Sequence, residues 1–263
     1  MSDAAKDAAL ARRLLGMLDL TTLNDSDDDQ VIRALAVNAA TPWGHVAALC
    51  TWSRLIGAAL DSLAGSGVPV AAVANFPAGA PDVAAAAAEC TQALAAGASE
   101  VDVVFPWRAY LAGDRDTPLA LVRACRAACG ARAHLKVILE SGQLATPARI
   151  REAADIAIAG GAHFLKTSTG KTQPGATLMA AEVMLDAIAH AQSGGVRVGF
   201  KASGGIRTMA EACGYLALYE QRFGSGSAGP AVFRIGASQL VHELLAVAAG
   251  TGVNKGSAAA DKY

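Results

Sequence analysis

The chain has 263 residues, of which 53% are hydrophobic and 17% charged, and its formal net charge is -1. This balance excludes a disordered chain, and the absence of a basic excess argues against nucleic acid as a partner. No apolar run reaches the roughly 18 residues of a membrane span, and the N-terminus lacks the basic-then-apolar pattern of a secretory leader, so we expect a cytoplasmic protein that binds no membrane.

Short apolar runs alternate with alanine-rich segments along the chain, and the two kinds of segment predict strands and helices in turn. The predicted strands are 17–20, 45–50, 70–76, 99–105, 134–140, 162–168, 196–202 and 231–236. The predicted helices are 82–96, 117–129, 147–159, 174–193, 208–222 and 238–249. From the second strand onward the runs recur every 25 to 35 residues, which is the spacing of βα units in a parallel sheet.

No linker or change in composition divides the chain into two parts. Eight βα units without a second domain predict a closed (β/α)8 TIM barrel of the α/β class over residues 1–249, with an N-terminal helical extension. Residues 250–263 then form a flexible C-terminal tail. The alternative is an open doubly wound sheet, but it calls for a glycine-rich fingerprint after the first strand, and none occurs here.

Charged residues interrupt several predicted strands, although parallel barrel strands normally read as continuous apolar runs. The chain has only seven lysines, and Lys136, Lys166 and Lys201 each lie within such a run. Asp102 and Asp19 interrupt two others. Taken singly, each of these residues could form a buried ion pair. Because four neighbouring strands supply Asp102 and the three lysines, we predict one functional cluster at the C-terminal mouth of the barrel, where active sites of this fold lie.

Two buried lysines on adjacent strands suggest Schiff-base chemistry. An unperturbed lysine is a poor nucleophile at pH 7, because its pKa is about 10.4. A second ammonium about 6 Å away, together with desolvation, can lower that pKa by roughly three units. Lys166 and Lys201 fit such a pair, and Asp102 suits proton transfer directly or through a water.

Glycines follow the last two predicted strands and suggest an anion site. Gly204 and Gly205 come after one strand and Gly236 after the next, and each loop opens a helix whose free N–H groups attract an anion. In barrels of this kind, these two loops are the usual phosphate cradle. Gly170 and Lys171, after the preceding strand, add a further donor. Five scattered cysteines without zinc-site spacing argue against a disulfide framework or a metal site.

Taken together, these segments resemble deoxyribose-phosphate aldolase over nearly the whole chain. The matching motifs are Asp19-Leu-Thr-Thr-Leu-Asn24, Asn75-Phe-Pro77, Glu100-Val-Asp-Val-Val-Phe-Pro106, Leu135-Lys-Val-Ile138, Lys166-Thr-Ser-Thr-Gly170, Gly199-Phe-Lys201, Gly204-Gly205, Arg207-Thr208 and Arg234-Ile-Gly-Ala-Ser238. The resemblance implies a Schiff-base aldolase, free of metal and cofactor, that reversibly splits 2-deoxy-D-ribose 5-phosphate into acetaldehyde and glyceraldehyde 3-phosphate in deoxynucleoside breakdown. Its partners would be phosphorylated sugars and aldehydes, and a homodimer is expected.

The resemblance also implies a role for each matched position. Lys166 corresponds to the imine-forming lysine, Lys201 to the neighbour that depresses its pKa, Asp102 to the proton-transfer group and Lys136 to a supporting lysine. Asp19, Thr21, Cys50 and Thr167 are expected at the substrate. The positions that match the phosphate site are Gly170, Lys171, Gly204, Gly205, Gly236 and Ser238.

The terminal residue, Tyr263, matches a tail tyrosine of the family that enters the site and assists proton transfer. Cys50 matches a cysteine that unsaturated aldehydes can trap. The sequence departs from the family pattern at Ala202, Ser203 and Gln239, where a proline, an alanine and a phosphate-loop serine are usual. A lost hydroxyl at Gln239 could weaken phosphate binding or admit unphosphorylated aldehydes.

Two rival functions remain open at this point. The first is another Schiff-base aldolase or transaldolase on the same barrel, although such enzymes usually show a single strand lysine. The second is a phosphate-binding barrel without lyase activity.

Overall fold

The computed structural model describes residues 2–251, and eight parallel strands in this part of the chain close into a barrel. Neighbouring strands follow chain order, and β10 pairs with β1 to complete the circle. The barrel strands are β1 (Leu18–Thr21), β4 (Ala48–Thr51), β5 (Val70–Ala74), β6 (Glu100–Val104), β7 (His134–Ile138), β8 (Phe164–Lys166), β9 (Gly199–Ser203) and β10 (Phe233–Ala237). The predicted closed barrel of the α/β class is therefore confirmed.

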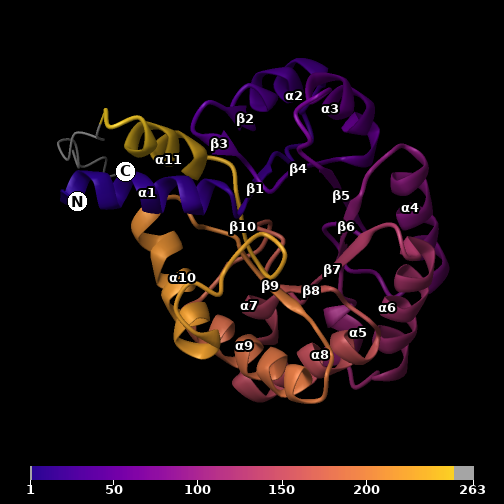
Figure 1. The fold of residues 1–263 in the computed structure, drawn as a ribbon. Helices are drawn as coiled ribbons and strands as arrows, with labels where there is room; N and C mark the ends of the chain where they lie inside the picture. The colour runs from indigo at the N-terminus through magenta and orange to yellow at the C-terminus, as the bar shows by residue number, and fades with distance from the viewer. Residues whose placement is uncertain (1, 252–263) are drawn as a thin grey trace, which may run out of the picture.

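Helices surround the barrel as an outer ring (Figure 1). They are α1 (Asp3–Leu15), α2 (Asp29–Ala36), α3 (Ile56–Ser62), α4 (Val83–Ala95), α5 (Trp107–Leu111), α6 (Asp116–Cys129), α7 (Ser141–Leu144), α8 (Pro147–Ala159), α9 (Leu178–Ser193), α10 (Met209–Phe223) and α11 (Leu240–Ala248). A 3-10 turn (Ser53–Leu55) precedes α3, and β2 (Ala40–Thr41) pairs with β3 (Gly44–His45) in a small hairpin outside the barrel.

Each predicted strand and helix has a counterpart within a few residues. The largest shift is at the start of α9, predicted at residue 174 and observed at Leu178. Thr177 sets this boundary, because its hydroxyl accepts a hydrogen bond from the N–H of Ala180 at 3.1 Å. The segments between β1 and β5 also contain α2, the hairpin and α3, which the apolar pattern did not predict.

The N-terminal helical extension is present as α1, which lies beside α11 (Figure 1). Ser2 caps the helix, and its buried residues are Ala11, Leu14 and Leu15. Arg12 donates to the carbonyl of Ala248 at 3.0 Å, which joins the first helix to the last. The domain boundary at 249 stays a prediction, and the tail beyond residue 251 lies outside the described residues.

The side chains inside the barrel divide into an apolar part and a charged part. A small apolar cluster carried mainly by β4 and β5 consists of Leu23, Ala48, Cys50, Ala71 and Val73. The remaining strands supply the charged side chains described below.

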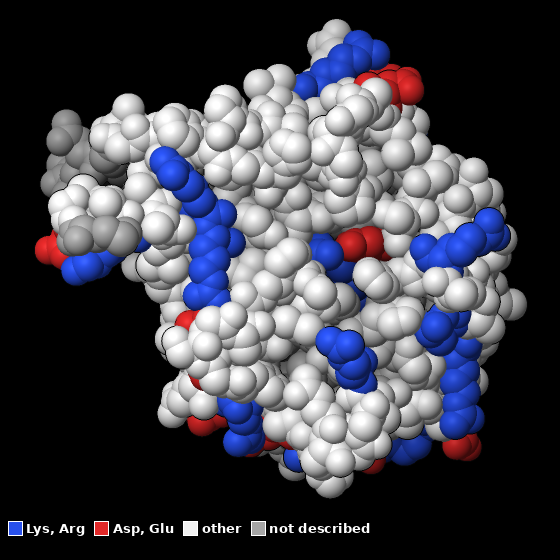
Figure 2. Space-filling model, in the orientation of Figure 1, with Lys and Arg blue, Asp and Glu red and all other residues white. Residues whose placement is uncertain are grey.

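Within residues 2–251, none of the helices has the length and apolarity to cross a lipid bilayer. On the face in Figure 2, lysine and arginine side chains are spread over several parts of the surface, and charged atoms are also visible inside the central hollow.

Candidate active site

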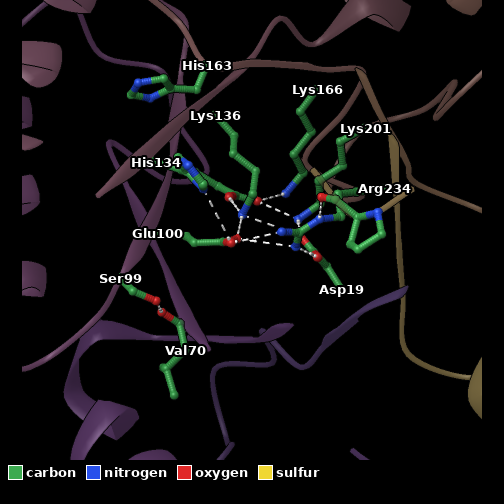
Figure 3. A network of polar contacts seen from close by, with 12 residues as sticks. Asp19, Val70, Ser99, Glu100, His134, Lys136, His163, Lys166, Lys201 and Arg234 are labelled. Atoms are coloured by element: carbon green, nitrogen blue, oxygen red, sulfur yellow. Dashed lines mark hydrogen bonds and ion pairs between the residues drawn. The ribbon is translucent and has the colours of Figure 1, made fainter. Parts of the chain in front are cut away.

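Seven ionisable side chains meet inside the barrel and form one network of ion pairs (Figure 3). Strand register brings them together: Asp102 lies opposite Lys136, and Lys201 lies between Lys166 and Arg234 on its two neighbouring strands. The network consists of the carboxylates of Asp19, Glu100 and Asp102 and the cations of Lys136, Lys166, Lys201 and Arg234. All seven side chains are buried.

Asp102 is the central carboxylate of the network. One of its oxygens, Oδ2, accepts hydrogen bonds from Lys166 Nζ and from Lys201 Nζ, each at 2.8 Å. The other oxygen, Oδ1, accepts from Lys136 Nζ at 2.8 Å. The predicted grouping of one acid with three lysines is therefore present. It lies within the barrel, and Lys136 lies one layer deeper than Lys166, because Lys166 pairs in register with Ile138.

Two further carboxylates, Asp19 and Glu100, and Arg234 form the part of the network farthest from the carboxyl ends of the strands, called its floor below. Arg234 Nη1 lies 2.5 Å from Asp19 Oδ1, and its Nη2 lies 3.0 Å from Glu100 Oε1. Lys136 Nζ lies 2.5 Å from Glu100 Oε2 and 3.3 Å from Asp19 Oδ2. Asp19 Oδ2 also accepts from Lys201 Nζ at 2.5 Å. Every cation except Lys166 therefore contacts at least two carboxylates.

The pKa values of the three lysines shift in different directions because their partners differ. Burial lowers the pKa of Lys166, and the nearby Lys201 ammonium lowers it further, against the opposing effect of Asp102. Burial also acts on Lys136 and Lys201, but their several carboxylates outweigh it and raise both pKa values. At Asp102, burial is outweighed by Lys136, Lys166 and Lys201, which hold its pKa well below the usual range. Lys166 is thus the lysine that gives up its proton most readily.

A cavity of about 290 Å³ opens above the network at the carboxyl ends of the strands. Lys166 is the network residue that lines it. Of the predicted substrate and phosphate positions, Thr21, Gly170, Lys171, Gly204, Gly205, Gly236 and Ser238 also line it. The sequence-predicted nucleophile and the predicted anion loops therefore share one cavity.

The loops after β9 and β10 line this cavity with residues whose backbone N–H groups are available. Within the described part of the chain, no hydrogen bond engages the N–H of Gly204, Gly205, Ser238 or Gln239. Gly205 has a φ of 91° and open space where a Cβ would lie, so the backbone there is accessible to a ligand. At Gly236 a Cβ would lie 3.0 Å from Lys201 Cε, so the glycine leaves room for that lysine.

One part of the predicted anion site is wrong. The sequence suggested that the free N–H groups of α10 would attract an anion, but Glu211 Oε2 accepts from the N–H groups of Arg207 and Thr208 at 2.8 and 3.0 Å. Thr208 in turn caps Glu211, which completes a capping box. A carboxylate of the chain itself therefore occupies that helix end, and the available donors are those of the glycine loop and of Ser238 and Gln239.

Three predicted substrate residues lie away from the cavity. Asp19 is in the ion network below it. The Thr167 hydroxyl donates to the carbonyl of Ser203 and accepts from the N–H of Ser203, each at 2.9 Å, so it ties β8 to β9. Cys50 is buried in the apolar cluster, where burial raises the pKa of its thiol. Tyr263 lies outside the described residues.

Glu100 and Arg234 are network members that were absent from the predicted site. Both could have been found by the test that identified the lysines, since each interrupts an apolar strand. Their contact with each other was not predictable from the sequence, because it joins β6 to β10 across the barrel.

Two positions that depart from the family pattern also line the cavity, namely Ser203 and Gln239. The Ser203 hydroxyl is engaged, because it donates to the carbonyl of Ser168 at 2.6 Å.

Comparison with known proteins shows which family the chain belongs to. Residues 13–219 match the model of the DeoC/LacD family aldolases. Two structures named "putative deoxyribose-phosphate aldolase" are similar to this chain. The one from Toxoplasma gondii ME49 is 25% identical with a TM-score of 0.85, and the match covers 93% of this chain and 98% of that one. The one from Coccidioides immitis is 29% identical with a TM-score of 0.76 and coverages of 89% and 86%.

A third structure separates the fold from the chemistry. Triosephosphate isomerase from Bartonella henselae covers 90% of this chain, and 99% of its own length, at 12% identity and a TM-score of 0.53. The barrel is thus shared with an enzyme of another class, whereas the family match spans most of the chain. The chain belongs to the DeoC/LacD family of aldolases.

Proposed function

We propose that this aldolase forms a Schiff base at Lys166 and reversibly cleaves 2-deoxy-D-ribose 5-phosphate to acetaldehyde and glyceraldehyde 3-phosphate. The observation that supports this most directly is the position of Lys166. Lys166 lines the cavity, and among residues 2–251 its amine contacts a single carboxylate oxygen, which it shares with Lys201. The reaction takes place on the lysine, and the proposal includes neither a metal ion nor a cofactor.

Lys166 acts first, as the nucleophile. In its neutral form the amine attacks the aldehyde carbon C1 of the open-chain sugar, and loss of water from the carbinolamine gives a protonated imine. The lowered pKa of Lys166 favours the neutral amine. Lys201 stays protonated beside it, because burial is outweighed by Asp102 and Asp19, which raise its pKa.

The second step breaks the carbon–carbon bond. A water beside Asp102 takes the proton of the C3 hydroxyl and passes it to solvent, the C2–C3 bond breaks, and its electron pair moves toward the imine nitrogen, which neutralises the iminium. Glyceraldehyde 3-phosphate leaves, and an enamine remains on Lys166. Protonation of the enamine at C2, followed by hydrolysis of the imine, releases acetaldehyde and restores the amine. We assign the C2 protonation to Tyr263, on the basis of the family resemblance.

The phosphate of the substrate is assigned to the loops after β9 and β10. The free N–H groups of Gly204, Gly205 and Ser238, with Lys171 from the loop after β8, offer donors to an anion of this size. Lys171 Nζ donates to the carbonyl of Leu23 at 2.7 Å, which holds its charge at the cavity edge. A homodimer and a cytoplasmic location stay predictions.

Reductive trapping tests this function. The protein is treated with acetaldehyde and sodium borohydride, digested and analysed by peptide mass spectrometry. We expect an ethyl group on Lys166, and we expect cleavage of 2-deoxy-D-ribose 5-phosphate by the untreated enzyme. The matched control is Lys171→Met, which removes a lysine of the same cavity and leaves the Lys166 adduct in place.

The outcomes separate the rival functions. An adduct on Lys166 without cleavage of the phosphorylated deoxysugar would identify a Schiff-base aldolase or transaldolase of other specificity. No adduct on a folded protein would indicate a phosphate-binding barrel without this chemistry, and the proposal would be withdrawn.

A further inference from the structure

The charge count of the barrel interior raises a question that the reaction itself does not answer. The network contains four cations and three carboxylates, so with every group ionised it would carry one excess positive charge. An uncompensated charge is costly in a buried site. Loss of one lysine proton removes the excess, and the contacts decide which lysine loses it.

Arg234 determines how many carboxylates remain for the lysines. Its guanidinium contacts one oxygen of Asp19 at 2.5 Å and one oxygen of Glu100 at 3.0 Å, and Figure 3 shows it directed at both. Together with Lys136, it balances these two carboxylates. By charge count, one carboxylate then remains for Lys166 and Lys201, and the one that both contact is Asp102. Lys201 in addition contacts Asp19, which leaves Lys166 as the less compensated of the two.

We propose that Arg234 is a positioning residue for the Schiff-base reaction: by occupying Asp19 and Glu100 at the floor of the barrel, it leaves Lys166 as the neutral lysine. This inference rests on the proposed function. Arg234 touches no substrate, since it lies outside the cavity lining, and it acts through the carboxylates that it neutralises.

Other titratable groups near the network are unchanged in the variants that test this proposal. His134 Nδ1 lies 3.8 Å from Glu100 Oε1 at the floor. Cys50 faces the network from β4. Glu140, after β7, accepts from the Thr169 hydroxyl at 2.6 Å and makes no ion pair in the described part of the chain. Glu100 also contacts Lys136 and His134, and the loss of these contacts is common to Glu100→Gln and the double variant, so the difference between those two variants reports on Arg234.

The proposal predicts opposite effects from two members of one ion pair. Arg234→Met removes a positive charge, so Lys166 keeps its proton to higher pH. Glu100→Gln removes a negative charge, so Lys166 loses its proton at lower pH. Each shift should be about one unit for charges separated by roughly 10 Å at an effective dielectric of 20. The double variant removes one charge of each sign and should return the profile toward wild type.

The experiment measures the rate of acetaldehyde trapping on Lys166 by cyanoborohydride as a function of pH. It uses the wild type, Arg234→Met, Glu100→Gln, the double variant and Arg234→Lys, which keeps the positive charge. We expect the rising limb of the profile to move up by about one unit in the first variant and down by about one unit in the second. It should stay near wild type in the double variant and in Arg234→Lys.

Each outcome decides a separate point. A purely structural role would lower trapping in the single variants without moving the limb in opposite directions, and that result would overturn the inference. If Arg234→Met fails to fold, the Glu100→Gln and double variants still test the inference, because the rising limb of the pH profile should shift in Glu100→Gln and not in the double variant. Failure of the wild type to trap acetaldehyde at all would instead contradict the proposed function.

Discussion

Lys166 Nζ and Lys201 Nζ donate to the same oxygen of Asp102, each at a distance of 2.8 Å. Two ammonium groups on a single carboxylate oxygen cannot both be fully compensated. Lys201 also reaches Asp19, whereas Lys166 has no second carboxylate among the described residues. The asymmetry between two otherwise similar lysines therefore arises from β1, which supplies the additional acid.

Replacing Lys201 tests this asymmetry. In Lys201→Leu, Asp102 and Asp19 keep their charges and Lys166 becomes the only amine on Asp102 Oδ2. We expect the pKa of Lys166 to rise by about two units, so that imine formation requires higher pH. The pH dependence of reductive trapping measures this shift. A profile that coincides with that of the wild type would show that Lys201 does not tune the nucleophile.

Two buried lysines should have opposite effects on stability. Lys166→Met removes a desolvated amine that has one shared partner, and we expect the free energy of unfolding to rise by about 1 kcal/mol. Lys136→Met removes the cation that contacts Asp19, Glu100 and Asp102 together and leaves their oxygens without that buried partner, so we expect a loss of about 3–5 kcal/mol. Urea unfolding at neutral pH provides both values. Equal losses in the two variants would refute the difference in compensation.

The depressed carboxylates predict acid sensitivity. Burial opposes their charged forms, but the neighbouring cations outweigh it and lower the pKa values of Asp19, Glu100 and Asp102. A carboxylate whose pKa is lower in the folded state stabilises the fold above its unfolded pKa of about 4. That contribution is lost as pH falls from there through the folded value. Thermal melts below pH ~4 should decline more steeply for the wild type than for the Glu100→Gln/Arg234→Met variant.

Lys171 is expected to discriminate phosphorylated from unphosphorylated sugars. Lys171→Met removes a cation from the cavity edge, so KM for 2-deoxy-D-ribose 5-phosphate should rise by roughly tenfold, as for one charge-assisted hydrogen bond of about 1.5 kcal/mol. The effect on kcat/KM for unphosphorylated 2-deoxyribose should be several-fold smaller. Lys6→Met, on the exposed surface of α1, is the matched control. Equal effects on both sugars would place the phosphate elsewhere.

The C-terminal residue gives a prediction for the final proton transfer. Deleting Tyr263 should slow the exchange of the acetaldehyde methyl protons with solvent, because that exchange requires protonation of the enamine at C2. Imine trapping on Lys166 should persist, since it precedes this step. Proton NMR in deuterated buffer follows the exchange, and a parallel loss of trapping would assign the tail to binding or folding instead.

The sequence was informative about the barrel because its signals are local. Apolar runs between glycine turns locate the strands, and Thr146-Pro147 correctly places the start of α8. The same locality explains α2, which was missed: its N-cap, Asp28, is one of three consecutive aspartates, and nothing in the charge run distinguishes it. Thr177 likewise caps α9 only because the preceding loop delivers it to that helix.

The site was harder to predict because its contacts cross the barrel. Lys166 and Asp102 were readable as charges in apolar strands, and in the structure Lys166 Nζ donates to Asp102 Oδ2. The pairing of Arg234 with Glu100 depends on which strands face one another, and the sequence carries no such information for a single residue. Glu211 caps α10 at the helix end where the sequence predicted an anion. The capping-box pattern of Thr208 and Glu211 was the sequence signal that could have indicated this.

Gly236 shows how a position without a side chain can be constrained by chemistry elsewhere. A methyl group there would lie 3.0 Å from both Lys201 Cε and Ser203 Cβ. A saturation mutagenesis screen for activity should therefore report Gly236 as nearly as intolerant as Lys201. That intolerance would report the space that the Lys201 side chain requires, in addition to any contact that Gly236 makes with the substrate phosphate.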